Sequence, residues 1–395
     1  MVVLTPYTLL AAALPATVFA NRISVNGKQA NSPSPARQYV ETLKRHEIEV
    51  PAALMERAAE EDAAAISGSA PLTPERGDAD EMFLIPVKVG EDELNMKFDT
   101  GSNYVWVYST DQPEDQLGDH TPYDTGSGEK LNQTFKIQFG DSGQNDGTIT
   151  GNVYLDSVSV GDSITFPKQA IEAATDINST WLGDEPYDGV FGLGRGSMFN
   201  TKPPHPTFLH NIRESLEEKV FATALKHEEP STLDIGFIDE SKYSGEIHYG
   251  YAGGVGSWWN INANINGTNN NARIDTGSPL ILIDEDAVRD YYAQIPGSWH
   301  GEWELLYRLP CNSTPPDLTI SVFHGSETQF DAVVPGKYVN LGKKDVGPGP
   351  RDLCFGAIQS DRGAVQSVFG TAFLKGRYTV FDLEEGRLGF ADLAE

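Results

Sequence analysis

The feature that most constrains the fold of this chain is an internal repeat. Residues 95–107 are Asn-Met-Lys-Phe-Asp-Thr-Gly-Ser-Asn-Tyr-Val-Trp-Val, and residues 271–283 are Asn-Ala-Arg-Ile-Asp-Thr-Gly-Ser-Pro-Leu-Ile-Leu-Ile. Each copy is followed by two apolar residues and a glycine, at 190–192 and at 368–370. The glycine of Asp-Thr-Gly-Ser and the glycine that follows the two apolar residues are 91 positions apart in one half, Gly101 to Gly192, and 93 in the other, Gly277 to Gly370. Such repetition predicts two homologous lobes whose equivalent loops meet at a cleft.

The residue pattern within the lobes predicts an all-β fold. From Met82 onward, short runs rich in β-branched and aromatic residues, such as 83–89 and 152–160, alternate with segments of Gly, Asp, Asn and Ser. Helical patterns are sparse, and the clearest are 206–218 and 285–294. We therefore expect a bilobal chain with pseudo-twofold symmetry and a few short helices. The N-terminal β lobe is expected over residues 81–255 and the C-terminal β lobe over 256–395.

The first 80 residues have a different composition. Residues 1–20 form an apolar run that ends in Val-Phe-Ala, which resembles a signal-peptidase site. A membrane anchor is the alternative, but two prolines interrupt the run and it is short for a transmembrane helix. Residues 21–80 are rich in Ala, Glu and Pro, which favours a removable propeptide over a solvated arm. We therefore expect a secreted, extracellular protein, with a vacuolar fate as the alternative.

The net charge of −28 limits the partners of this chain. A surface so acidic repels a phosphate backbone and an anionic membrane, so we expect neither nucleic acid nor membrane as a partner. The acidity has two interpretations that the sequence does not separate. It either keeps the surface solvated or adapts the protein to acid, where protonation of carboxylates reduces self-repulsion.

The cysteines and the glycosylation sequons are consistent with export. Cys311 and Cys354 are the two cysteines of the chain, and in a secreted protein such a pair forms a disulfide more often than a metal site. Closing a loop of this length stabilises the fold by roughly 4 kcal/mol in the chain-entropy account. Four Asn-x-Ser/Thr sequons predict surface glycosylation, at Asn132, Asn178, Asn266 and Asn312.

The aspartates of the repeat are the predicted catalytic residues. An Asp placed between apolar strand halves is costly unless its charge is hydrogen-bonded or shared. If the lobes bring Asp99 and Asp275 together, repulsion keeps both from ionising, and the pair can act as general base to a water and general acid to a carbonyl. Neighbouring hydroxyl and N–H groups are the predicted support for this dyad, from Thr100, Gly101, Ser102, Thr276, Gly277 and Ser278.

Two other motifs of the sequence do not fit a catalytic role. A third Asp-Thr-Gly-Ser at 124–127 lacks the apolar frame, which predicts an exposed turn. The tetrapeptide Gly-Asp-Ser-Gly at 140–143 matches the nucleophile region of chymotrypsin-like serine proteases, but only His46 and His120 precede it, and neither has a supportive context. The histidines show no metal-ligand spacing, so we expect no metal and no cofactor.

Together these motifs resemble the pepsin family of aspartic proteases, and most closely its fungal penicillopepsin and aspergillopepsin group. The resemblance spans Met82 to Ala391. It rests on the segments 98–102, 187–194, 274–278, 284–292, 369–374 and 378–382, with Trp106 and the two cysteines, and on 235–239 with 242–245 for the fungal group.

The resemblance implies a pepsin-like double β-barrel that hydrolyses proteins at acid pH. It implies polypeptide substrates with bulky apolar side chains beside the scissile bond, sensitivity to pepstatin-type inhibitors, no cofactor, and a monomer. It also implies that the hairpin 134–151 is the flap over the substrate, with Phe139, Gly140 and Asp141 at its tip and Trp106 beneath it.

The flap departs from the family pattern, because Phe139 stands where the family usually has tyrosine. Without the hydroxyl, the hydrogen bond from the flap toward Trp106 is lost, and we expect a slower enzyme. The alternative is a catalytically weakened pepsin-like protein that binds polypeptides. Asp141 matches a flap aspartate of the fungal group, which implies acceptance of Lys on the amino side of the scissile bond; an uninvolved turn aspartate is the alternative.

Overall fold

The computed structural model describes residues 35–46, 48, 50–55, 57, 65–75, 81–139, 147–178, 185–198, 200–253, 258–301, 305–344, 350 and 352–394. The chain divides into two compact units, Met1–Ala64 and Ala65–Glu395. In the first unit, helix α1 (Pro35–Arg45) buries Val40 against Val50 and Leu54. The predicted signal peptide, residues 1–20, lies outside the described residues.

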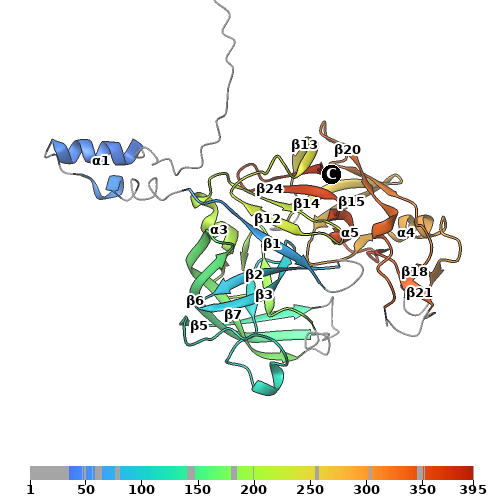
Figure 1. The fold of residues 1–395 in the computed structure, drawn as a ribbon, viewed down its shortest axis with the longest axis horizontal. Helices are drawn as coiled ribbons and strands as arrows, with labels where there is room; N and C mark the ends of the chain where they lie inside the picture. The colour runs from blue at the N-terminus through green and yellow to red at the C-terminus, as the bar shows by residue number, and fades with distance from the viewer. Residues whose placement is uncertain are drawn as a thin grey trace, which may run out of the picture. The chain divides into compact units, whose positions relative to one another are not determined.

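The second unit contains one sheet of 13 strands (Figure 1). Its spatial order is β13-β25-β24-β11-β12-β1-β2-β3-β8-β4-β7-β6-β5. The bounds in chain order are β1 (Gly68–Pro74), β2 (Phe83–Val89), β3 (Asp92–Asp99), β4 (Val105–Val107), β5 (Glu129–Phe139), β6 (Gly147–Val160), β7 (Ile164–Asn178), β8 (Gly189–Gly192), β11 (Val220–Ala224), β12 (Ser231–Ile235), β13 (Tyr243–Tyr251), β24 (Arg377–Asp382) and β25 (Arg387–Leu393).

A sheet of seven strands forms most of the C-terminal half. Its order is β20-β19-β14-β15-β23-β16-β22, with β14 (Asn260–Ile265), β15 (Thr268–Ile274), β16 (Ile281–Ile283), β19 (Leu318–Val322), β20 (Phe330–Val334), β22 (Ile358–Ser360) and β23 (Ser367–Phe369). Small sheets are formed by β9 (Ser197–Met198) with β10 (His205–Pro206), and by β17 (Trp299–His300), β18 (Tyr307–Pro310) and β21 (Leu353–Phe355).

The described helices of the second unit are short, as the sequence predicted. They are α3 (Phe208–Ile212), α4 (Glu285–Tyr292) and α5 (Thr371–Leu374), with single 3-10 turns η1 (Glu114–Gln116), η3 (Arg213–Ser215) and η4 (Gly336–Tyr338). Helix α4 begins where Asp284 accepts hydrogen bonds from the backbone N–H groups of residues 286 and 287. This side-chain cap satisfies N–H groups that have no partner within the helix.

The two halves of the second unit repeat one strand arrangement. Strand β3 pairs in parallel with β8, and β15 pairs in parallel with β23. The strand after each Asp-Thr-Gly-Ser motif, β4 or β16, then pairs antiparallel with that same partner. The apolar-apolar-Gly motifs of the sequence are these partner strands, which explains their constant spacing from the aspartates. The all-β, bilobal, pepsin-like fold class is therefore confirmed.

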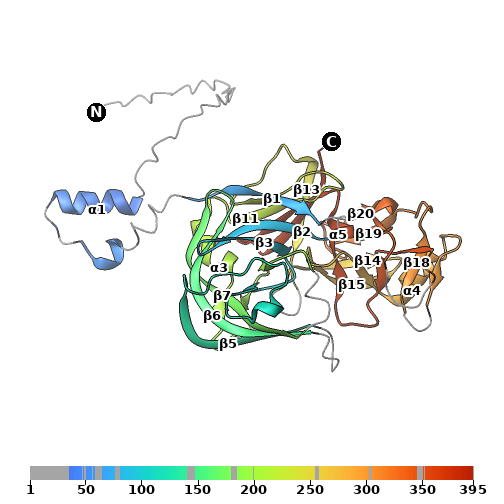
Figure 2. The ribbon, with the colours of Figure 1, turned by 60° about the horizontal axis from the view of Figure 1, so that its bottom comes forward.

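In Figure 2, β5, β6 and β7 curve around one side of this unit while β14 and β15 lie toward the other.

Two strands do not follow the lobe boundaries that the sequence suggested. Strand β1 pairs with β12 and β2, so residues 68–74 belong to the folded body although they lie within the predicted propeptide, 21–80. Strand β24 of the C-terminal half pairs with β11 of the N-terminal half. Sequence composition misses both facts because pairing partners in a shared sheet lie far apart along the chain. Removal of residues 21–80 stays a prediction.

The two cysteines form a disulfide, and the sequon asparagines are exposed. Cys311 and Cys354 are joined, with a Cα–Cα distance of 4.9 Å and a sequence separation of 43 residues. The predicted disulfide is therefore present. The four sequon asparagines, residues 132, 178, 266 and 312, are exposed. Within the described part of the chain, none of the helices is long and apolar enough to span a membrane.

Candidate active site

The two repeated aspartates stand at equivalent places in the fold. Asp99 is the last residue of β3, and Asp275 directly follows β15. The side chains of Phe98 and Ile274, one residue earlier, are buried in the core. Because successive side chains of a strand point to opposite faces, each aspartate is turned away from the core of its own lobe.

Four hydrogen bonds join the two motifs where the lobes meet. The Thr100 N–H donates to Oγ1 of Thr276 at 3.0 Å, and the Thr276 N–H donates to Oγ1 of Thr100 at 3.1 Å. The Thr100 hydroxyl donates to the carbonyl of Ile274 at 2.9 Å, and the Thr276 hydroxyl donates to that of Phe98 at 3.1 Å. Both threonines are fully buried, so these bonds satisfy groups that have no access to water.

The glycine of each motif allows the aspartates to approach. The Gly101 N–H donates to Oδ1 of Asp99 at 2.7 Å, and the Gly277 N–H donates to Oδ1 of Asp275 at 2.8 Å. A Cβ atom on Gly101 would overlap the carboxylate of Asp275, and one on Gly277 would overlap that of Asp99. Each glycine thus lies against the carboxylate of the opposite lobe, which brings the two acids face to face.

The electrostatics of the pair favour a single shared proton. Burial, the charge of Asp99 and a hydrogen bond with Asp99 raise the pKa of Asp275, whereas Lys97 and the Gly277 N–H lower it, and the net pKa is about 7. The Ser102 hydroxyl donates to Oδ2 of Asp99. Donors of this kind stabilise a carboxylate, so of the two acids the arrangement favours Asp275 as the one that holds the proton.

Among the residues predicted to support the dyad, Ser278 differs from its counterpart Ser102 in its side-chain hydrogen bond. Its hydroxyl accepts a hydrogen bond from the Leu280 N–H at 3.2 Å. Among the described residues the Ser278 hydroxyl makes no hydrogen bond to the carboxyl group of Asp275, whereas the hydroxyl of Ser102, its counterpart, donates to that of Asp99. The repeat therefore has equivalent backbones but unequal donors, and this difference distinguishes the two acids.

Aromatic side chains form the wall beside Asp99. Trp106 is buried, and its ring centroid lies 5.5 Å from that of Tyr108 and 6.5 Å from that of Tyr187. Burial raises the pKa of Tyr187, and Asp99 contributes to this rise. Within the described residues, Nε1 of Trp106 has no hydrogen-bond partner.

The predicted flap is described only in part. Its strands are β5 and β6, and the backbone of Phe139 pairs with Gly147. The side chain of Phe139 and the residues Gly140 and Asp141 lie outside the described residues. The role of this hairpin, and the loss of a bond between it and Trp106, therefore stay predictions.

One buried acid near this wall was not singled out by the sequence analysis. Glu172 of β7 is fully buried and faces Trp106 in the β4–β7 pairing. Its Oε2 accepts a hydrogen bond from Asn200 at 2.5 Å, and its Oε1 has no partner among the described residues. Burial raises the pKa of Glu172 to about 8. The available signal was a single Glu within the otherwise apolar run 170–174.

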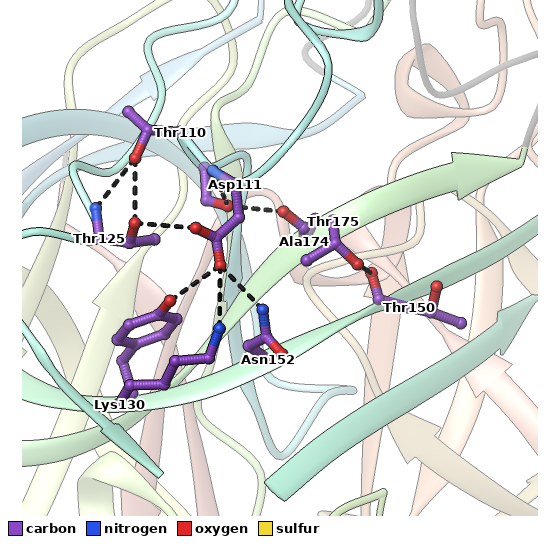
Figure 3. A network of polar contacts seen from close by, with 10 residues as sticks. Thr110, Asp111, Thr125, Lys130, Thr150, Asn152, Ala174 and Thr175 are labelled. Carbon is purple, nitrogen blue, oxygen red and sulfur yellow. Dashed lines mark hydrogen bonds and ion pairs between the residues drawn. The ribbon is translucent and has the colours of Figure 1, made fainter. Parts of the chain in front are cut away.

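The third Asp-Thr-Gly-Ser is an exposed turn, as predicted. Asp124 is exposed, and its Oδ1 accepts a hydrogen bond from the Gly126 N–H at 2.9 Å. Thr125 instead supports Asp111, to which its hydroxyl donates at 3.0 Å (Figure 3). This turn therefore belongs to a structural network of the N-terminal half, and the chain offers two framed aspartates rather than three.

The comparisons with known proteins agree with this geometry. The sequence model of the family described as eukaryotic aspartyl protease matches residues 82–393. The chain belongs to the eukaryotic aspartyl protease family. This aspartyl protease is 39% identical over 343 residues to aspergillopepsin-1 of Aspergillus fumigatus, an alignment that covers 84% of this chain and 83% of the relative.

Two further relatives support the assignment. Penicillopepsin-1 of Penicillium rubens is 37% identical over 363 residues, which cover 89% of this chain and 86% of the relative. The crystal structure of the aspartic proteinase from Irpex lacteus superposes with a TM-score of 0.65 at 21% identity, covering 83% of this chain and 98% of that one. The first likeness places the protease among the fungal aspartic endopeptidases that the sequence suggested, and the second shows the shared fold.

Proposed function

We propose that this protease is a secreted endopeptidase that hydrolyses peptide bonds of proteins at acid pH, with a water activated between Asp99 and Asp275. The supporting observation is the approach of the two carboxyl groups, each against the glycine of the opposite lobe. Two acids so placed, one ionised and one protonated, supply a base and an acid to the same reacting group.

In the proposed reaction, the carboxylate of Asp99 takes a proton from the water as the water oxygen attacks the peptide carbonyl carbon. Asp275 gives its proton to the carbonyl oxygen, so the tetrahedral intermediate is neutral. The proton held by Asp99 then passes to the leaving nitrogen while the intermediate returns a proton to Asp275. The C–N bond breaks, and the dyad recovers its single proton.

The pKa of Asp275 sets the expected upper pH limit. A group with its pKa near 7 carries its proton below that value and loses it above. The dyad then holds two negative charges and lacks the general acid. Activity is therefore proposed to decline as the pH rises through about 7.

Export and maturation are part of the proposal. Residues 1–20 would be the signal peptide. The propeptide was predicted to span residues 21–80, but residues 68–72 pair with β12 in the body, so we propose a shorter propeptide that ends before β1. A monomer, extracellular or alternatively vacuolar, fits the disulfide and the exposed sequons. Pepstatin-type inhibitors and polypeptide substrates are the proposed ligands, without nucleic acid or membrane.

The substrate would lie between the dyad and the hairpin of β5 and β6. Phe139, Gly140, Asp141 and Trp106 are the proposed flap and substrate contacts. A preference for bulky apolar side chains beside the scissile bond is part of the proposal, and the resemblance to the fungal relatives supports it.

The alternative is a pepsin-like protein that binds polypeptides but cleaves them poorly, which the substitution at Phe139 favours. A protein-digestion assay at pH 3–5, with and without pepstatin, separates the two. Pepstatin-sensitive cleavage that disappears near neutral pH supports the protease. Binding of denatured protein at acid pH without any cleavage product would instead support the binding protein.

A further inference from the structure

The internal repeat contains a second pair of equivalent residues beside the aspartates. Lys97 precedes Asp99 by two positions, and Arg273 precedes Asp275 by two positions. In β3 the apolar residues Leu94, Met96 and Phe98 are buried on one face, whereas Lys97 is half-buried on the other face, where Asp99 is itself buried. Residues two apart on a strand share a face and lie roughly 7 Å apart. Each cation therefore lies on the same face as an aspartate, one pleat before it.

Strand β15 shows the same alternation. Ala272 and Ile274 are buried, and Arg273 between them is half-buried. Each of the two facing lobes thus carries one aspartate and one basic residue at equivalent positions. The pseudo-twofold symmetry that brings the acids together consequently places a cation on either side of them.

Lys97 extends along the wall of the N-terminal half. Its Nζ lies 5.8 Å from the centroid of the Tyr187 ring. Lys97 lowers the pKa of Asp275, which shows that its charge reaches the dyad. It forms no ion pair with a carboxylate among the described residues.

Arg273, in the C-terminal half, contacts Trp258 and Gln366. Its guanidinium carbon lies 4.1 Å from the centroid of the Trp258 ring, and its Nη2 donates to Oε1 of Gln366 at 2.5 Å. Its Nε is buried and has no partner among the described residues. Both Asp99 and Asp275 act on its charge.

The charges around the scissile position are unbalanced. A dyad with one shared proton carries a single negative charge, and two cations flank it. Besides Asp275, Lys97 acts on Glu75, whose pKa is raised by burial and by Glu81 and lowered by Lys344 and Lys97. Glu81 itself pairs with Lys344. Partly buried cations without a carboxylate partner favour the binding of an anion.

From this arrangement we propose that Lys97 and Arg273 are specificity-determining residues that favour substrates with a Glu or Asp side chain next to the scissile bond. A peptide bond centred on the dyad places its two flanking residues against opposite lobes, so each cation serves one of these positions. The proposal rests on the proposed function and narrows its substrate class, because the two half-buried cations would select a substrate side chain that ends in a carboxylate.

The pH range of this selection is limited on both sides. A substrate Glu side chain ionises above about pH 4.3. The dyad keeps its single proton below about pH 7, given the pKa of Asp275. The groups that act on the two cations are Asp99, Asp275, Tyr187 and Glu75. Preference for Glu over Gln should therefore be present at pH 5.5 and absent at pH 3.

The proposed preference for Glu conflicts with the expectation that Asp141 of the flap favours Lys beside the scissile bond. Acceptance of Lys on the amino side of the scissile bond was attributed to Asp141, but a substrate Lys at a position next to Lys97 is repelled by it. Glu and Lys substrates thus separate the two ideas directly.

The test uses one peptide series with Leu, Glu, Gln or Lys at either position that flanks the scissile bond. The mature enzyme, Lys97→Met and Arg273→Met are compared by kcat/KM at pH 5.5 and pH 3. We expect the enzyme to favour Glu over Gln by about five- to tenfold at pH 5.5, the size of a modest charge interaction. Lys97→Met should abolish the preference at one flanking position, and Arg273→Met should abolish it at the other.

Matched controls remove a cation elsewhere. Lys88→Met lies at the other end of the β2–β3 pair, where Lys88 is opposite Glu93, and Arg289→Met lies on the exposed face of α4. Both should keep the Glu preference. If Lys97→Met does not fold, Lys97→Gln takes its place, and the comparison of pH 5.5 with pH 3 in the unmodified enzyme still tests the idea.

Two outcomes would overturn the inference in different ways. Efficient cleavage of Leu peptides with equal rates for Glu and Gln at pH 5.5 would refute the charge selection and leave the proposed function intact. Absence of any cleavage, Leu peptides included, would refute both.

Discussion

The backbone N–H of Thr100 donates to the hydroxyl of Thr276, and the backbone N–H of Thr276 donates to the hydroxyl of Thr100, at 3.0 and 3.1 Å. This reciprocal pair lies directly beneath the two aspartates and connects the lobes at residues adjacent to them. The distance between the carboxyl groups is therefore fixed by buried hydrogen bonds and not by the loops alone.

Thr100→Val should reduce both stability and activity. The substitution keeps the shape of the side chain but leaves the Thr276 N–H and the Ile274 carbonyl without partners. Each buried group left unsatisfied costs about 1–3 kcal/mol. Urea unfolding and kcat/KM measure the two effects, and Thr100→Ser, which keeps the hydroxyl, should restore most of both. Unchanged stability and rate in Thr100→Val would show that the reciprocal pair does not hold the dyad.

Glu172→Gln should reduce the loss of folding stability that occurs as the pH rises toward neutral. Because burial raises the pKa of Glu172 to about 8, the folded state holds a proton that the unfolded state has lost. Its stabilising effect is complete below the unfolded pKa of about 4.3 and is lost as the pH rises toward 8, by at most about 1.4 kcal/mol per pH unit. Asp275 contributes in the same sense up to about pH 7.

Thermal unfolding between pH 4 and pH 8 measures this slope. The slope should become shallower in Glu172→Gln. It should stay unchanged in the control Glu93→Gln, where the side chain of Glu93 is exposed. An identical pH dependence in the wild type and Glu172→Gln would contradict the protonated buried state of Glu172.

Asp111→Asn should weaken the N-terminal half, and its effect has the opposite pH dependence. Burial raises the pKa of Asp111, but hydrogen bonds from Asn152, Tyr154 and Thr125 and the charge of Lys130 lower it by more, so the net pKa is lowered (Figure 3). The stabilisation is therefore present above the unfolded pKa of about 3.9 and is lost as the pH falls through the lower folded pKa.

The expected cost of Asp111→Asn is about 1–3 kcal/mol at pH 5–6, since hydrogen bonds to a charged group are lost. The cost should shrink as the pH falls toward the lowered pKa of the folded state, where the wild-type carboxyl begins to take up a proton. Urea unfolding at pH 5.5 and pH 2.5 gives both values. A cost that does not change between these pH values would mean that charge has no part in the network.

Lys97→Met should move the alkaline limit of activity upward. Lys97 favours the ionised form of Asp275, and its removal raises the pKa of that acid. The dyad then keeps its proton to higher pH. A pH profile of kcat/KM on a peptide with Leu at both flanking positions isolates this effect from substrate charge. If the alkaline decline of kcat/KM stays at the same pH in Lys97→Met, or moves to lower pH, Lys97 and Asp275 are not coupled in this way.

The repeat allowed much of the site to be predicted from the sequence. Asp99 and Asp275, the support from Thr100, Thr276 and the two glycines, and the exposed third motif all follow from which residues frame each Asp-Thr-Gly-Ser. The parallel pairing of β3 with β8 and of β15 with β23 also follows, because the apolar-apolar-Gly motifs recur at one spacing.

Other features depend on contacts that no local pattern encodes. The pairing of β1 with β12 joins residues more than 150 positions apart, so composition alone assigned residues 68–74 to the propeptide. The burial of Glu172 depends on which strand covers it. Lys97 and Arg273 were visible in the repeat, but their meaning required the strand alternation that places them on the face of the aspartates.

The central claim is that Asp99 and Asp275 act as one catalytic pair with one proton, and kcat/KM of Asp275→Asn measures it most directly. With folding verified by thermal unfolding and a peptide carrying Leu at both flanking positions, we predict a loss of at least about 10³-fold between pH 3 and pH 6, since the general acid is removed. A folded Asp275→Asn protein that retains more than about a tenth of the wild-type kcat/KM would contradict the account.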